Sequence, residues 1–246
     1  MDASRTRFVS GQDPSGGVDD VRRQLADSRT AGAVFAEWRA NLSPLDVPHG
    51  EAHIDAEALA RGAAVTQSEG VLPLVTVAMP DLVSHSAAVT QAVTGNALTA
   101  LFTQMQRLEV DTSALLVRMN MVVAGEASQQ AVPDGVARAT LKVIADSVPA
   151  DVPGIAFLSG GQPIDQACVN LSALATTRVA RDVPWRLTFA FTRALVTSSL
   201  EAWRGESENV TDAQRVLVQS CRQAGRAVSP SVAAGSPSAA ARVSSS

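Results

Sequence analysis

The tripeptide Ser159-Gly160-Gly161 offers the clearest starting point for chemistry in this sequence. It follows a short apolar run, Ile155–Leu158, which begins directly after Pro153-Gly154. Such a pattern is typical of a buried parallel strand that ends in a glycine loop before a helix. Glycine lets backbone N–H groups approach an anion closely, and the helix N-terminus behind the loop adds partial positive charge. The loop is a candidate anion site, while the glycines taken alone are explained more simply by a tight strand-to-helix turn.

Other chemistry-bearing residues form weaker patterns. His49, Glu51 and His53 lie close together, but their sequence HGEAH does not have the HExxH spacing of zinc proteases, and no third ligand is evident. A solvated loop is the better interpretation, and we predict no metal site. Cys168 and Cys221 have no partner histidine in sequence, so we interpret them as thiols without a catalytic role.

Composition excludes several classes of function. The chain has 246 residues, 46% hydrophobic and 18% charged, with a net charge of −4, which favours a soluble globular protein and gives no reason to expect nucleic acid as a partner. No apolar run approaches the roughly 20 residues that span a bilayer, so no membrane association is expected. The N-terminus lacks the apolar segment of a signal peptide. With two cysteines and no disulfide framework, we expect a cytoplasmic protein, and we expect no cofactor.

Hydrophobic patterning predicts strands that alternate with helices. The five predicted strands are Val34–Leu42, Val71–Ala78, Ala114–Val122, Gly154–Ser159 and Arg186–Phe191. Helices are predicted over residues 18–32, 54–69, 84–108, 133–147, 194–203 and 212–223. A further helix is predicted to begin at Pro163. Strands that are each followed by a helix indicate a parallel α/β fold. Residues 1–17 and 226–246 are rich in small and polar residues, so we predict that both segments are disordered and flank one unit at 18–225.

Placed in this order, the predicted segments resemble the class I fructose-1,6-bisphosphate aldolase family. The resemblance covers roughly residues 18–225, and the segment VPGIAFLSGGQ at 152–162 is nearly verbatim. The other matching segments are FAEWRANL (35–42), EGVLPLV (69–75), LLVRMNMVVAG (115–125), PWRLTFAFTRAL (184–195) and LEAWRGESENVTDAQ (200–214).

The resemblance implies a (β/α)8 barrel with its site at the carboxyl ends of the strands. In this family a lysine forms a Schiff base with the ketose carbonyl, and carboxylates and a second lysine transfer protons. A Ser-Gly loop and an arginine hold a phosphate, and the products are dihydroxyacetone phosphate and glyceraldehyde 3-phosphate.

The matching segments correspond to strands 4–8 of that barrel, so the expected fold is a TIM-barrel-type repeat that is incomplete at its N-terminus. Strands 1–3 have no counterpart, because three βα units need about 90 residues and residues 1–17 cannot supply them. We therefore expect an open sheet, an incomplete gene product, or a chain that pairs with a second copy or another barrel-completing partner.

Four positions depart from the family pattern. Arg118 stands at the Schiff-base position, Glu37 at the second lysine, and Thr76 and Ala78 at the two acidic positions. Arginine stays protonated and cannot supply the neutral amine that an imine requires. Because Glu37 and Arg118 would both project into the barrel mouth, we predict an ion pair between them, with anion binding by Arg118 as the alternative. Lys142 is the only lysine in the chain, and it falls in the middle of a predicted outer helix.

The positions that bind phosphate in the family match its pattern more closely than the catalytic positions do. Ser159, Gly160 and Gly161 match the family's loop, Arg193 matches its phosphate arginine, and Arg39 also matches. The glycine before that arginine is Thr192 here, whose Cβ would crowd a phosphate. Trp38 and Asn120 match the family and are interpreted as packing residues.

The sequence thus predicts an aldolase-family protein with weak or no Schiff-base activity. Two alternatives belong to other functional classes. One is a non-catalytic module that binds a sugar phosphate or inorganic phosphate. The other is a half-barrel that completes its sheet with a partner chain.

Overall fold

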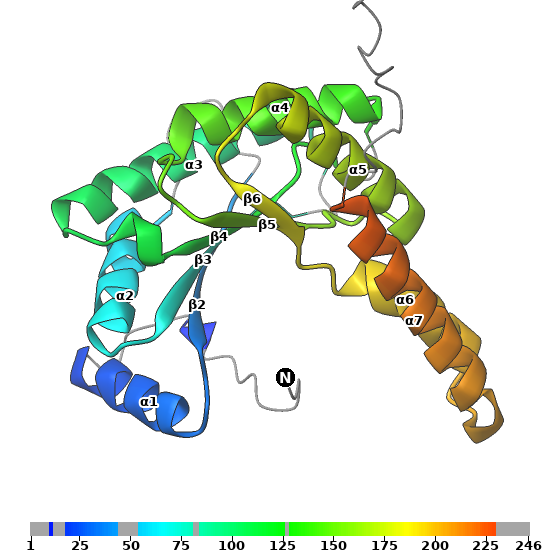
Figure 1. Cartoon of the computed structure of the whole chain (residues 1–246), viewed down its shortest axis with the longest axis horizontal. Coiled ribbons are helices and arrows are strands. Elements are labelled where there is room, and N and C mark those ends of the chain that lie inside the picture. The colour runs from blue at the N-terminus through cyan, green and yellow to red at the C-terminus, as the bar shows by residue number, and fades with distance from the viewer. Residues whose placement is uncertain (1–9, 12–17, 44–53, 81–83, 126–127, 230–246) are drawn as a thin grey trace, which may run out of the picture.

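The computed structural model describes residues 10–11, 18–43, 54–80, 84–125 and 128–229. Its described strands form one parallel sheet in the order β1-β2-β3-β4-β5-β6. Figure 1 shows this sheet as a curved surface with α2, α3, α4 and α5 along its outer side. The strands are β1 Ser10–Gly11, β2 Phe35–Asn41, β3 Leu72–Ala78, β4 Leu116–Asn120, β5 Gly154–Leu158 and β6 Arg186–Phe189.

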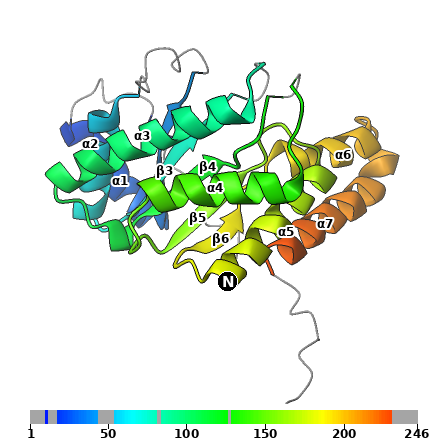
Figure 2. The ribbon, with the colours of Figure 1, turned by 90° about the horizontal axis from the view of Figure 1, so that it is seen from above.

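A helix follows each strand from β2 onward, as the sequence predicts. The helices are α1 Val18–Thr30, α2 Ala56–Ser68, α3 Ala87–Arg107, α4 Pro133–Ser147, α5 Ile164–Arg181, α6 Arg193–Trp203 and α7 Val210–Ala227. Local signals explain several starts: Asp55 and Ser86 accept capping hydrogen bonds from the backbone N–H groups of Ala58 and Val89. Pro133 occupies the first turn of α4, where its missing N–H is no loss. Figure 2, seen from above, shows α3 and α4 running across the sheet.

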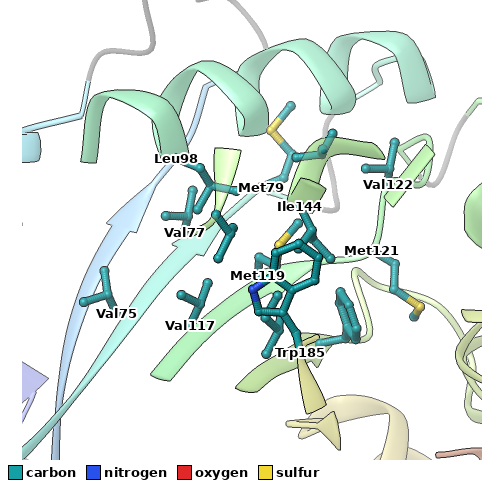
Figure 3. Close-up of a cluster of buried hydrophobic side chains, with 14 of the residues drawn as sticks. Val75, Val77, Met79, Leu98, Val117, Met119, Met121, Val122, Ile144 and Trp185 are labelled. Carbon is teal, nitrogen blue, oxygen red and sulfur yellow. The ribbon is translucent and has the colours of Figure 1, made fainter. Parts of the chain in front are cut away.

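The main hydrophobic core lies between the outer face of the sheet and these helices. Because successive strand residues point to opposite faces, alternate residues of β3, β4 and β5 are buried in this layer, and those of β6, Leu187 and Phe189, are partly buried against it. The members labelled in Figure 3 come from strands, strand ends and the covering helices: Val75, Val77, Met79, Val117, Met119, Met121, Val122, Leu98, Ile144 and Trp185. The core therefore fixes which strand residues face the opposite, inner side.

Two ends of the predicted unit differ from expectation. Residues 1–17 were predicted to be disordered, but Ser10–Gly11 pair with Glu37 and Trp38 as a sixth, two-residue strand. The C-terminal segment was predicted to lose structure at residue 226, whereas α7 continues to Ala227 because Ala224 and Ala227 are buried. Residues 1–9, 12–17 and 230–246 of these two segments lie outside the described residues.

The described sheet is open. Within the described ranges β6 pairs only with β5, and β1 pairs only with β2. Each open edge presents unpaired backbone groups. On the inner face between the two edges, Thr76, Ala78 and Asn120 are buried. Among the described helices none has both the length and the hydropathy of a membrane span.

Candidate functional site

The strand register gathers the predicted site residues on the inner face of the sheet. Arg39, Thr76 and Arg118 lie in one row across β2, β3 and β4. Asn41, Ala78 and Asn120 end these same strands two residues later, nearer the carboxyl ends. This two-residue spacing keeps their side chains on the same face.

Arg118 and Glu37 form a largely buried ion pair. The Arg118 guanidinium bonds the Glu37 carboxylate, and its Nε donates to the Thr76 hydroxyl at 3.0 Å. Each charged side chain is only 13% exposed. The predicted Glu37–Arg118 pair is therefore confirmed, and the charge of Arg118 is balanced by a carboxylate of its own chain.

A pocket of about 390 Å³ lies at the carboxyl ends of the strands. Five of the predicted site residues line it: Arg39, Ala78, Ser159, Gly160 and Arg193. The four other predicted residues, Glu37, Thr76, Arg118 and Gly161, are not among its described lining. Three of those four are the ion pair and its threonine: Thr76 and Arg118 lie in the same row as Arg39, and Glu37 precedes Arg39 by two residues on β2. The pocket thus brings together four of the five residues expected to hold an anion, without Glu37 and Arg118.

The glycine loop forms a tight turn whose backbone conformation favours glycine over other residue types. Gly160 and Gly161 have φ values of +62° and +79°, in the left-handed region that glycine adopts readily. A Cβ on Gly160 would also lie 3.1 Å from Asn120 Nδ2 and 3.3 Å from Val123 Cγ2. The Ser159 carbonyl accepts the Gln162 backbone N–H at 3.3 Å, which closes the turn. Glycine at 160 is therefore favoured by the backbone conformation, and a larger residue would require Asn120 or Val123 to shift by a few tenths of an ångström.

Arg193 is the first residue of α6 and lies across the pocket from the β2 residue Arg39. Thr192 precedes it, also lines the pocket, and has a φ of −113°. Because this φ is negative, the backbone at Thr192 does not require glycine. The start of α6 adds partial positive charge to that of Arg193.

Two asparagines that were not predicted as site residues, Asn41 and Asn120, also line the pocket. Asn120 was interpreted as a packing residue, but its Oδ1 accepts the Met79 N–H at 2.9 Å and it lines the pocket. Asn41 also lines the pocket and accepts a hydrogen bond from Arg39 Nε at 2.9 Å. The available signal was spacing, since each asparagine follows a site arginine by two residues on one strand.

The remaining candidates lie away from the pocket. Lys142 is on the exposed side of α4, as predicted, and it forms an ion pair with Asp146 at 2.8 Å. Trp38 is buried and donates to Thr66 Oγ1 at 2.8 Å, which confirms its packing role. Burial, with a smaller contribution from the Asp165 charge, raises the pKa of the Cys168 thiol to about 11.

The three residues of the rejected metal pattern, His49, Glu51 and His53, lie outside the described residues. Within the described part of the chain, no three His, Cys, Asp or Glu side chains gather in a way that could hold a metal ion.

The buried pair leads to a stability prediction. Glu37→Gln leaves the Arg118 guanidinium buried without a counter-charge, so the free energy of unfolding should fall by about 3 kcal/mol. Glu57→Gln is the matched control, because it breaks the exposed Glu57–Arg61 pair on α2 and should cost less than about 0.5 kcal/mol. Urea denaturation measures both changes. Equal losses in the two variants would contradict the assignment of a buried, energetically coupled pair.

Known proteins share both the sequence and the fold. A family model described as Glycolytic, fructose-bisphosphate aldolase class-I, matches residues 6–245. Fructose-bisphosphate aldolase 5, cytosolic, of Arabidopsis thaliana is 36% identical over 216 residues, which are 87% of this chain and 60% of that protein. The fructose-bisphosphate aldolase of Drosophila melanogaster is 35% identical over 225 residues, covering 91% of this chain and 62% of the relative.

A solved structure has a similar fold. The fructose-bisphosphate aldolase of Plasmodium falciparum superposes with a TM-score of 0.77 at 33% identity, over 86% of this chain and 62% of that one. The chain spans about three-fifths of the length of these relatives. The expected α/β fold of TIM-barrel type is confirmed. This chain belongs to the class I fructose-bisphosphate aldolase family.

Proposed function

We propose that this protein binds a sugar phosphate or inorganic phosphate at the strand ends and has little or no Schiff-base aldolase activity. One observation carries the proposal. On the inner face of the sheet, the charge of Arg118 is balanced by Glu37, whereas Ser159, Gly160 and Arg193 line an open pocket.

The loss of activity follows from the residue types at the matched positions. Arg118 stands where the resemblance places the Schiff-base lysine, and a guanidinium has no neutral amine to attack a carbonyl. Thr76 and Ala78 stand at the acidic positions, and neither side chain transfers protons at neutral pH. Lys142 cannot replace the missing amine, because it lies on the outer surface of α4.

Anion binding is supported by the charge of the pocket. Arg39 and Arg193 approach it from β2 and from the start of α6, and none of its described lining residues is Asp or Glu. Ser159 adds a hydroxyl, and the glycine turn adds backbone N–H groups that can approach a phosphate oxygen closely. The site suits a small anion that carries one or more phosphate groups.

The cytoplasm is the compartment proposed for this function. Relatives named as cytosolic or cytoplasmic aldolases support it, among them that of Cicer arietinum, which is 35% identical. A glycolytic sugar phosphate would be available there.

A second role as a half-barrel partner is supported by the open edge of β6. Its four residues pair with β5 on one side, and within the described chain no strand pairs with the other side. A second copy or another chain could extend the sheet there through backbone hydrogen bonds.

The absence of Schiff-base chemistry is tested by trapping. Incubation with dihydroxyacetone phosphate and sodium borohydride should leave the intact mass of the chain unchanged, because no amine in the pocket can form a reducible imine. A full-length fructose-bisphosphate aldolase treated in parallel serves as the positive control. A stable adduct on this chain would overturn the inactive assignment, and peptide mapping would identify the amine.

Anion binding is tested by isothermal titration with inorganic phosphate and, separately, with fructose 1,6-bisphosphate. Arg193→Ala should weaken binding about tenfold or more, since a charge-assisted hydrogen bond contributes roughly 1.5–3 kcal/mol. Arg61→Ala removes an exposed arginine of α2 outside the pocket and should leave the affinity unchanged. Absence of heat with both ligands, or equal losses in the two variants, would reject the proposed site.

The partner role predicts a specific mass in solution. Light scattering coupled to size exclusion should give a mass above that of one 25.5 kDa chain. Leu187→Pro, which removes an edge N–H, should shift the mass toward one chain. A monomer at all concentrations with cooperative unfolding would rule out self-association through this edge.

A further inference from the structure

A chain of side-chain amides lies directly behind the glycine turn. Asn170 Nδ2 donates to Gln162 Oε1 at 2.5 Å, and Gln162 Nε2 donates to the Ser159 carbonyl at 2.5 Å. Gln166 Nε2 donates to Asn170 Oδ1 at 3.3 Å and completes the series. Asn170 and Gln162 each accept on one side and donate on the other, so the chain has a single direction that ends on the turn.

The inner members of this chain are well placed to act as a fixed support. Asn170 lies in the second turn of α5 and is 2% exposed, so its orientation is set by the helix and by its surroundings. Gln162 is half-buried between Asn170 and the turn. A buried amide whose donor and acceptor are both used holds its neighbour in one geometry, because any rotation leaves a polar group unsatisfied.

The turn needs such a support because it is built from glycine. Gly160 and Gly161 reach their positive φ angles without strain, but the same freedom makes other backbone conformations accessible. The peptide unit between Ser159 and Gly160 is planar and trans, so its carbonyl and its N–H point in opposite directions. Holding the Ser159 carbonyl toward Gln162 therefore turns the Gly160 N–H away from Gln162.

We infer that Gln162 and Asn170 are positioning residues for anion binding, acting through the Ser159–Gly160 peptide rather than by touching the ligand. Neither belongs to the described lining of the pocket, whereas Ser159 and Gly160 do. If that peptide flipped, the Ser159 carbonyl would lose both hydrogen bonds from Gln162. The inference rests on the proposed anion-binding function and names the residues that control its affinity.

The experiment is a double-mutant cycle on the full chain. Gln162→Ala should weaken phosphate binding about tenfold, and Asn170→Ala about threefold to tenfold, as expected for loss of a hydrogen bond or of its support. In the Gln162→Ala background, Asn170→Ala should cause no further loss, because Asn170 acts only through Gln162. Additive losses in the double variant would contradict the proposal that Asn170 acts through Gln162. Unchanged phosphate affinity in Gln162→Ala would contradict the positioning role of Gln162.

A matched control separates positioning from general destabilisation. Gln67→Ala removes a different half-buried amide. Gln67 Nε2 donates to the carbonyls of Asp111 and Ala114, which precede β4 at the opposite end of the sheet. The variant should lower the melting temperature by a similar amount and leave the phosphate affinity unchanged. A loss of affinity in this control equal to that of Gln162→Ala would assign the effect to stability alone.

Amide hydrogen exchange gives a second readout that needs no ligand. The Gln162 N–H, bonded to the Ser159 carbonyl, should exchange about tenfold faster in Asn170→Ala because the turn is less restrained. The Ala167 N–H, bonded to the Pro163 carbonyl at 2.9 Å in the same segment, should not change. If the wild-type chain bound no phosphate, the proposed function would fail, and this exchange result alone would decide whether Asn170 restrains the turn.

Discussion

The buried ion pair between Glu37 and Arg118 is the constraint on which the inner face of this sheet depends. The two residues come from β2 and β4, so the guanidinium reaches across β3, where Thr76 accepts a further hydrogen bond. Two buried charges are tolerated only when each satisfies the other with good geometry. The pair therefore couples the register of three strands and balances charge where the family's lysine chemistry would take place.

For the site above that pair, the proposed function separates anion binding from bond-making chemistry. An imine needs one particular side chain at one position, and Arg118 cannot provide it. Phosphate recognition uses positive charge, a helix start and backbone N–H groups, which several residue types can supply together. In this chain Arg39, Ser159, Gly160 and Arg193 line one pocket, whereas Arg118 lies outside its described lining.

The glycine turn illustrates how local freedom is controlled by distant structure. Its left-handed conformation is adopted most readily by glycine, yet glycine does not select that conformation by itself. In this chain the selection comes from Gln162 and Asn170, which connect the turn to the buried side of α5. The affinity of the pocket is in this way linked to the packing of a helix that does not line it.

The sequence by itself determined the alternation of strands and helices, the family, and the position of the glycine loop, because these depend on local periodicity and on ordered motifs. It also predicted the Glu37–Arg118 pair, because the family resemblance places both side chains at strand ends in one barrel mouth. Only the tertiary structure placed Asn120 at the pocket, extended α7 to Ala227 and paired Ser10–Gly11 with β2. Each of these depends on contacts between segments far apart in the chain, and residue type and spacing do not encode such contacts locally.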